Sequence, residues 1–330
     1  MDFNRINWKK TFITAGIPLI ILVVLAFFPM YGWQYGVTLF NHFLLFVILS
    51  VAWTIFSGTT GYISLATAAF FGIGIYAAAL LYPSVGDRYP LYVVVLIGAG
   101  VSFVLAFIVG AITLRLRGIY FAMFTFGLVL FFREIIYWYE ITVKGIRGRF
   151  VYQDPANVNN NVYYYLLVIM ALTMLVAYLI KRSKYGLALQ GIGENEEAAA
   201  HMGVNITMVK VLTYAVSASF MGAVGAVMAT KWVYVDPGVA FNPMMSFSPV
   251  LMAIFGGFGS IYGPVIGAVI FSYIEEVLTT ANWFGIDWTQ FYKVIFGAIL
   301  VATILFLPSG LVSLIQNVWR RVMGRRRASA

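Results

Sequence analysis

Runs of about 20 apolar residues recur along this chain, and they constrain its fold more than any other feature. A helix needs about 20 residues to cross roughly 30 Å of hydrocarbon. Unpaired backbone groups in lipid are costly, and no alternating pattern typical of a β-barrel is present, so the runs are predicted to be helices. They lie near residues 12–30, 37–56, 62–82, 91–113, 118–138, 162–180, 211–230, 246–258, 264–280 and 290–307.

Composition supports a membrane protein. Of the 330 residues, 62% are hydrophobic and only 10% are charged, whereas an ordinary soluble domain is about 45–50% apolar. Too few charged residues are present to cover the surface of a soluble protein of this length. We therefore predict an all-α, polytopic integral membrane protein with about ten transmembrane helices, some short or re-entrant, in one domain covering residues 1–330.

The positions of the basic residues predict the orientation. Most of the 21 lysines and arginines form short clusters beside the apolar runs, including the basic tail 319–330. This is the positive-inside pattern, which predicts that both termini lie in the cytoplasm. We expect the chain in the cytoplasmic (inner) membrane as a multi-pass protein. Residues 139–161 then form an external loop and residues 181–210 a cytoplasmic one. No basic stripe with interleaved aromatic residues lies outside the runs, which argues against a nucleic-acid partner.

Several kinds of chemistry are excluded or disfavoured. The chain has no cysteine, which removes disulfides and thiolate chemistry, and its two histidines lie far apart, which argues against a metal site. A membrane-embedded enzyme would need clustered histidines or paired carboxylates, and none stand out. No GxxxxGK[ST] phosphate-binding loop is present, so the chain does not hold ATP in that way. We expect no cofactor and no enzymatic activity in this chain.

The stretch "GENEEAAAHMG" at 193–203 is unusually polar for this chain. Glu194, Glu197 and His201 follow a spacing of three and four residues, which places them on one face of a helix. The alanines favour helix, and Gly203 is suited to end it. We predict a short surface helix that fits a groove on another protein, and the alternative is a solvated connecting loop.

The stretch "GGFGSIYGP" at 256–264 interrupts an apolar run with glycines and a proline. Glycine loosens a helix and proline removes a donor, so the flanking pieces are predicted to be short or re-entrant helices. A tight cytoplasmic turn that only connects two helices is equally compatible. Elsewhere, small residues such as Gly222 at four-residue spacing predict close helix packing.

Few ionisable residues lie near the spans. Arg133 and Glu134 fall late in one run, and Glu275 and Glu276 fall late in another. We predict that they lie near the outer interface and pair with one another or reach towards water. A proton-driven carrier more often has a carboxylate at mid-membrane, and its absence argues against that class of transporter.

Four stretches, in order, resemble one family. They are "GYISLATAAFFGIGIYAA" at 61–78, "RLRGIYFAMFTFG" at 115–127, "SKYGLALQGIGENEEAAAHMGVN" at 183–205 and "GGFGSIYGPVIGA" at 256–268. Together they resemble the permeases of branched-chain amino acid ABC transporters, specifically the LivM-type subunit. Within the third stretch, "EAAAHMG" is similar to the EAA-x3-G loop of ABC-importer permeases.

The resemblance implies a machine of several subunits. Two ATPase subunits supply energy, a homologous second permease forms the other half of the pathway, and an extracytoplasmic solute-binding protein delivers a small-molecule substrate. The residues implied for contact with the ATPases are Glu194, Glu196, Glu197, Ala198 and Gly203; those for a hinge are Gly256, Gly257, Gly259 and Pro264; those for the substrate path are Ser64, Thr67, Tyr120 and Thr125.

The substrate is the least determined part of this prediction. Where the family usually has Gly-His after Ser-Leu, this chain has Ala66 and Thr67. The external "TVKGIRG" at 142–148 is only loosely similar to the family's TGGxxG. Branched-chain or related apolar amino acids are the first expectation, and urea or a short amide carried by the same machine is the second. A self-sufficient secondary carrier or channel is the alternative from another class.

Overall fold

The computed structural model describes residues 21–31, 33–81, 90–151, 158–232 and 234–280, with a few positions between 294 and 312. The long helices are α2 (Gln34–Thr60), α4 (Leu91–Thr113), α5 (Ile119–Trp138), α6 (Val158–Arg182), α9 (Ile206–Ala229) and α12 (Tyr262–Thr280). The shorter elements are η1 (Phe28–Tyr31), α3 (Thr67–Leu81), the π-turn η2 (Tyr139–Val143), α7 (Lys184–Glu194), α8 (Glu196–His201), α10 (Pro237–Ala240) and α11 (Met244–Gly256). Strands β1 (Arg149–Phe150) and β2 (Tyr234–Val235) pair in antiparallel fashion.

The predicted all-α, membrane-spanning class is confirmed. Seven helices among the described residues are long and apolar enough to cross a membrane, and two shorter apolar helices cover Ile21–Met30 and Thr67–Leu81. The predicted count of about ten is therefore approximate. Most of the predicted span near 290–307, the first part of the span near 12–30 and the basic tail 319–330 lie outside the described residues.

The centre of the bundle is built from α2, α3 and α9. Among the candidate spans, α2 and α9 are the most buried, and α9 packs along α3 and α4. This packing is close because of glycine: a Cβ on Gly74 would collide with the backbone of Gly222, and one on Gly225 would collide with the carbonyl of Phe71. The close packing predicted at Gly222 is confirmed.

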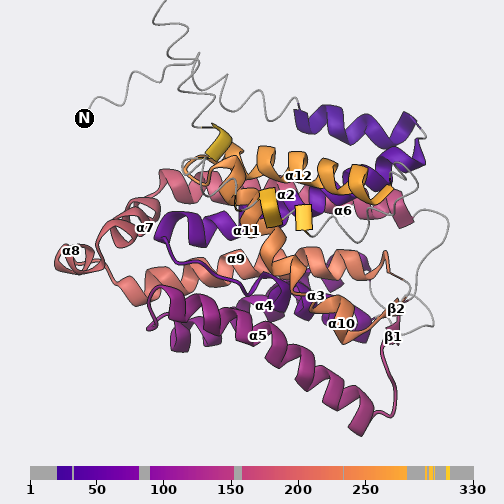
Figure 1. Ribbon diagram of the computed structural model, residues 1–330, viewed down its shortest axis with the longest axis horizontal. Helices are drawn as coiled ribbons and strands as arrows, with labels where there is room; N and C mark the ends of the chain where they lie inside the picture. Colours follow the sequence, from indigo (N-terminus) through magenta and orange to yellow (C-terminus); the bar gives the residue numbers. More distant parts are fainter. Residues whose placement is uncertain are drawn as a thin grey trace, which may run out of the picture.

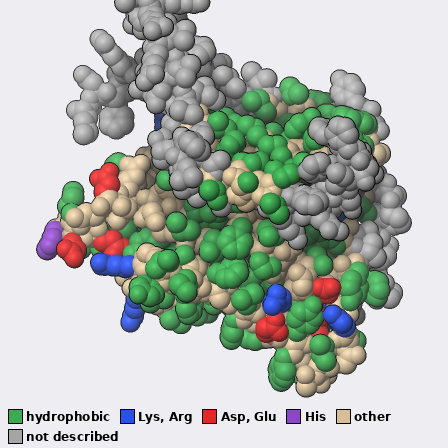
Figure 2. Space-filling view, in the orientation of Figure 1, with side chains coloured by type: hydrophobic (Ala, Val, Ile, Leu, Met, Phe, Trp, Pro, Cys, Tyr) green, Lys and Arg blue, Asp and Glu red, His purple; other side chains and the backbone are tan. Residues whose placement is uncertain are grey.

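The helices run between two polar ends. Figure 1 places α7 and α8 at one end of the bundle, on the left, and β1 and β2 at the opposite end. On the face drawn in Figure 2, charged side chains gather towards these two ends and hydrophobic side chains cover the area between them. This distribution is what a bundle that crosses a bilayer needs, because charges are costly in hydrocarbon.

The predicted span at 62–82 is wrong at its start. Residues 61–66 are not helical, and α3 begins only at Thr67. Other helices hold this irregular segment: the Trp53 indole donates to the carbonyl of Ser64 at 2.8 Å, and the N–H of Leu65 donates to Thr125 Oγ1 at 3.0 Å. Irregular backbone at membrane depth is tolerated where protein groups satisfy it, as they do here.

The predicted external loop at 139–161 is shorter than expected. Helix α5 continues through the π-turn η2 to Val143, and α6 already begins at Val158. Between them lies β1, which pairs with β2, a strand that follows α9 much later in the chain. The asparagine run that favoured a loop lies in the first turn of α6, so tertiary context overrides local composition here.

The glycine-rich stretch forms a turn between two packed helices. A Cβ on Gly256 would collide with the carbonyl of Gly263, and one on Gly267 would collide with the carbonyl of Met252. The glycines therefore allow α11 and α12 to touch backbone to backbone. Gly257 has a φ of 97°, which favours glycine. The turn lies beside the end of α6, because Lys181 Nζ donates to the carbonyl of Gly259 at 2.7 Å.

Candidate functional site

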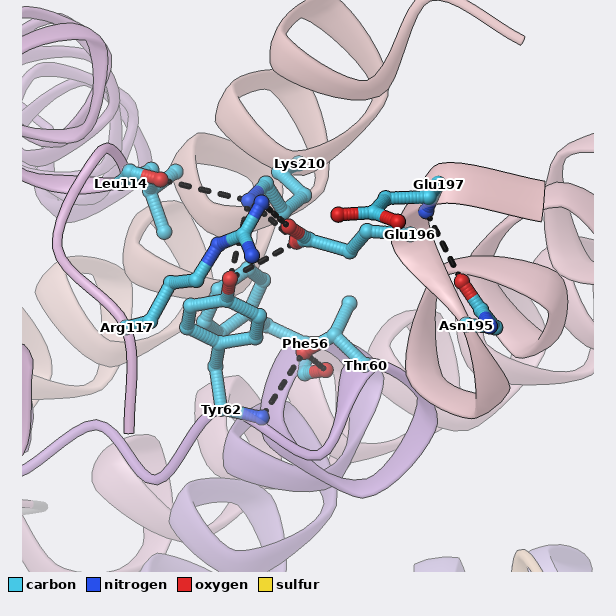
Figure 3. A network of polar contacts seen from close by, with 9 residues as sticks. All are labelled: Phe56, Thr60, Tyr62, Leu114, Arg117, Asn195, Glu196, Glu197 and Lys210. Atoms are coloured by element: carbon cyan, nitrogen blue, oxygen red, sulfur yellow. Dashed lines mark hydrogen bonds and ion pairs between the residues drawn. The ribbon is translucent and has the colours of Figure 1, made fainter. Parts of the chain in front are cut away.

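Four segments converge on one polar network at the α8 end of the bundle (Figure 3). Tyr62 comes from the turn between α2 and α3, and Arg117 comes from the turn between α4 and α5. Glu196 is the first residue of α8, and Lys210 lies in the first turns of α9. Most of the turns at this end are thereby linked through side chains.

Lys210 is buried at the centre of the network, with its side chain 4% exposed. Its ammonium donates to Glu196 Oε1 at 2.7 Å, to the Tyr62 hydroxyl at 3.2 Å and to the carbonyl of Leu114 at 3.2 Å. It also lies 4.4 Å from the centre of the Tyr62 ring. An ammonium has three donors, and three acceptors here offset the cost of burial.

Glu196 is the shared acceptor of the network. Its Oε1 accepts from the Tyr62 hydroxyl at 2.7 Å, and its Oε2 pairs with the Arg117 guanidinium at 3.1 Å. Burial raises the pKa of this carboxyl, but the hydrogen bonds from Lys210 and Tyr62 and the charges of Lys210 and Arg117 outweigh burial and hold the pKa below its ordinary value. Glu196 is therefore ionised at neutral pH.

Asn195 separates α7 from α8, and it corrects the single helix predicted at 194–203. Its φ of −158° is extended, and its side-chain oxygen accepts from the N–H groups of Glu197 at 3.0 Å and Ala198 at 3.1 Å. This is an N-cap, which favours the start of a new helix. Glu194 consequently ends α7 and does not share a helix with Glu197 and His201.

The network divides the residues predicted to contact an ATPase into two groups. Glu194, Glu197, Ala198 and Gly203 are exposed. Glu196 instead faces the bundle, with its side chain 13% exposed. Behind α8, Ala199 packs into a small apolar cluster with Leu189, Ile192 and Val209. Helix α8 thus packs against the bundle through Ala199 and Glu196, and its opposite side, with Glu197 and Ala198, is exposed.

An open groove runs beside α8. Its walls are the end of α7 with the start of α8, the turn after α2 and the turn before α5; it is lined by Thr60, Gly61, Tyr62, Arg117, Gly118 and residues 192–197. One wall carries Glu194 and Glu197 and another carries Arg117, so the groove presents both signs of charge. Among the residues named for ATPase contact, Glu194, Glu196 and Glu197 line this groove.

Three of the four residues predicted for the substrate path lie together. Ser64, Thr67 and Thr125 are all buried around the start of α3. Two of them serve the fold there, since Thr125 accepts from the N–H of Leu65 and Ser64 Oγ accepts from the N–H of Ala66 at 3.4 Å; the hydroxyl of Thr67 is buried without a hydrogen-bond partner among the described residues. Tyr120 does not join them, because it is 71% exposed on the other side of α5.

The partners of Glu196 were not predicted from the sequence. Lys210 is the only charged residue within Ile206–Ala229, and such a residue next to an apolar run is a signal for a buried pair. Arg117 gave no comparable signal, because the positive-inside pattern already accounts for a basic residue in a short loop between two spans. Tyr62 was indistinguishable by sequence from the many other tyrosines of the chain.

A second carboxylate was also missed, at the opposite end of the bundle. Glu140 in η2 is fully buried and pairs with Arg149 at 3.0 Å. It also accepts from the N–H of Gly148 at 3.1 Å and from the Tyr76 hydroxyl at 3.4 Å. The pair predicted between Arg133 and Glu134 is confirmed at 3.0 Å.

Comparison with known proteins identifies the family. The family described as "Branched-chain amino acid transport system / permease component" matches residues 35–304. The high-affinity branched-chain amino acid transport system permease protein LivM of Salmonella typhimurium is 24% identical over 92% of this chain and 75% of its own length. LivM of Escherichia coli is 24% identical over 82% of this chain and 68% of its own length. LivH of Escherichia coli is 28% identical over 44% of each chain. No solved structure matches the chain. The chain belongs to the family of branched-chain amino acid transport system permease components.

Proposed function

We propose that this chain is the LivM-type permease subunit of an ABC importer for branched-chain amino acids, and that α8 receives the motion of a partner ATPase. The observation that carries this proposal is the geometry of α8. Its front, with Glu197 and Ala198, is open to a partner, while Glu196 ties its first turn to the body of the bundle. A helix that is anchored on one side and exposed on the other is suited to transmit force.

The proposed partners follow from what the sequence lacks and from the names of its relatives. The chain has no phosphate-binding loop, so two ATPase subunits supply the energy. LivM and LivH are both named as permease proteins of a branched-chain amino acid system, which supports a second, homologous permease beside this chain. An extracytoplasmic binding protein completes the proposed assembly.

The proposed orientation places α8 in the cytoplasm, together with both termini. The basic residues at this end support it: Arg117 lies in the α4–α5 turn, and Lys181, Arg182 and Lys184 lie around the end of α6. Lysines and arginines in short loops favour the cytoplasmic side. The glycine turn at 257–261 lies at the same end, since Gly259 accepts from Lys181.

The proposed transmission route runs from α8 through Glu196 to Tyr62. Tyr62 begins the irregular segment before α3, and that segment is hydrogen-bonded to α5 through Thr125 and, at the start of α3, to α11 through Ser246. A displacement of α8 therefore moves the ends of α3, α5 and α11 together. The hinge proposed at Gly256, Gly257, Gly259 and Pro264 lets α12 follow α11.

Reconstitution tests the proposal. Proteoliposomes that hold this chain, the second permease and both ATPases, supplied with the binding protein and ATP, are expected to accumulate leucine, and the chain alone is expected to move none. Uptake by the chain alone would identify a self-sufficient carrier or channel. ATP-driven uptake of urea with no uptake of leucine would support the ABC importer and identify urea as its substrate.

A further inference from the structure

Helix α5 packs with one face and leaves the opposite face open. Its buried residues are Phe121, Thr125, Leu128 and Val129. Its exposed residues follow the same helical spacing on the other side, and we call them the α5 stripe: Tyr120, Met123, Phe124, Gly127, Phe131, Glu134, Ile135 and Trp138. Among the seven candidate spans, α5 is the least buried. The α5 stripe is therefore a continuous open surface along a membrane-length helix.

One residue of the α5 stripe is charged. Helix α4 also has an exposed stripe, and its large residues there are apolar, such as Val101, Val104 and Ile108. The α5 stripe instead contains Glu134, whose side chain is 65% exposed and paired with Arg133. With Ile119, which follows Arg115 and Arg117, taken as the inner boundary, Glu134 lies about 22 Å along the helix at 1.5 Å per residue, in the outer third of the roughly 30 Å of hydrocarbon and towards the outer interface. A carboxylate at that depth is expected to face a water-filled space or protein.

The middle of the α5 stripe is an exposed surface at Gly127, as the exposed face of α4 is at Gly100. A Cβ added to Gly127 would meet no atom within 4 Å. The start of α3 offers no such space, because the N–H groups of Leu65 and Ala68 already donate to Thr125 and Ser246. Of the residues predicted for the substrate path, only Tyr120 lies on the α5 stripe.

We propose that the α5 stripe is this chain's wall of the solute route, and that Arg133 and Glu134 bind the carboxylate and the ammonium of a zwitterionic amino acid. This inference rests on the proposed function and names the residues that recognise its substrate. Phe131 and Ile135, on the same face as Glu134, contact the apolar side chain of the solute.

Charge neutrality gives the pair its selectivity. Arg133 and Glu134 satisfy each other when no solute is present, with the guanidinium Nε 3.0 Å from the carboxylate. A zwitterion adds one positive and one negative group and leaves the net charge of the site at zero. A simple amine or carboxylate would pair with one of the two groups and leave the other without its partner, which disfavours it relative to a zwitterion. Urea has no charges to pair, so the site favours amino acids over short amides.

Cysteine labelling tests whether the α5 stripe is accessible to water. The chain has no cysteine, so each variant carries one thiol in this subunit. In the complete transporter in membranes, Gly127→Cys and Phe131→Cys are expected to react with a charged, membrane-impermeant methanethiosulfonate, either at rest or during ATP turnover. Val101→Cys on α4 is the matched control, because Val101 lies as far before the end of α4 at Thr113 as Phe131 lies after the start of α5 at Ile119, and it is expected to stay unreacted. Failure of both α5 variants to react in both states would overturn the proposal.

Transport by variants of the pair tests recognition. In the reconstituted transporter, Glu134→Gln and Arg133→Gln are each expected to lower leucine uptake at least tenfold, and Glu134→Asp is expected to retain part of it. Glu276→Gln, which removes an acid bonded to Tyr35 on another helix, is the control and is expected to transport normally. Equal melting temperatures of all variants would show that the loss is not a loss of folding.

If the wild type takes up leucine and Glu134→Gln does so equally well, the recognition role is wrong while the proposed function stands. If the wild-type transporter takes up no leucine, the proposed function itself fails.

Discussion

The two ends of the bundle use the same chemistry for different tasks. At one end, Glu196 joins segments that are distant in sequence, since it lies 134 residues from Tyr62. At the other end, Glu140 mainly closes its own loop, because Gly148 and Arg149 follow it by 8 and 9 residues. A buried carboxylate that bridges distant segments couples their positions, whereas one that bridges neighbours stabilises a local turn.

The two carboxylates also differ in what surrounds them. Glu140 is fully buried behind β1, so little outside the fold can reach it. Glu196 lies at the base of an open groove and holds an exposed helix. We therefore expect substitutions at Glu196 to act on transport by folded protein and those at Glu140 to act on the amount of folded protein.

The largest effect is expected from Glu196→Lys. This change places a third cation beside Lys210 and Arg117 and removes their shared partner. Breaking a buried pair costs about 3–5 kcal/mol, which is enough to detach α8 from Lys210 and Tyr62 in the folded transporter. We therefore expect ATP-driven leucine uptake per folded transporter to fall about 100-fold or more. Uptake and ATP hydrolysis are measured in proteoliposomes. The double variant with Lys210→Glu restores one pair and should recover part of the uptake; normal uptake by the single variant would contradict the coupling role.

A smaller effect is expected from Glu197→Lys, one residue along. Its side chain is exposed and lies outside the polar network, so the melting temperature should not change. Loss of an exposed charge at a partner surface is expected to lower uptake about tenfold, or about 1.4 kcal/mol, and to leave ATP hydrolysis uncoupled. The substitution Met208→Lys on exposed α9 surface is the control. Equal uptake by the wild type and Glu197→Lys would remove Glu197 from the ATPase contact.

Glu140→Gln, at the opposite end of the bundle from Glu196, is expected to lower stability rather than transport. The variant leaves Arg149 without its partner charge, and we expect it to lower the free energy of unfolding by about 3 kcal/mol. Uptake per folded transporter should change less than about twofold, because the substitution leaves the Glu196 network intact. Thermal melting and uptake, normalised to folded protein, separate the two quantities. A loss of coupling with unchanged melting would mean that both ends transmit motion.

The smallest effect is expected from pH near neutrality. The pKa of Glu196 is lower in the folded protein than its ordinary value, so its contribution to stability is fully present above the pKa of an unfolded glutamate, about 4.3. That contribution is lost as pH falls through the lower, folded pKa. The difference in melting temperature between wild type and Glu196→Gln should be constant from pH 8 to pH 6 and shrink in the acid range. A difference that changes between pH 8 and pH 6 would point to another titrating group.

The membrane fold was predictable because it follows from long apolar runs, which need no knowledge of neighbouring helices. The non-helical start before Thr67 was not, since it depends on Trp53, Thr125 and Ser246 arriving from three other helices. Local patterns such as the EAA stretch located α8 correctly. They did not indicate that Glu196 turns inward, because its direction is set by Asn195 and Lys210 together.

Cross-linking of α8 tests the central claim most directly. Because the chain has no cysteine, Ala198→Cys places a single thiol in this subunit on the exposed face of α8. Labelled with a benzophenone maleimide and irradiated, it is expected to form a covalent adduct with an ATPase subunit of the assembled transporter, since the excited benzophenone inserts into a nearby C–H bond and needs no thiol on the partner; the free thiol is expected to react with impermeant maleimide only in inside-out vesicles. Reaction in intact cells, or the absence of any ATPase adduct in the assembled transporter, would contradict the account.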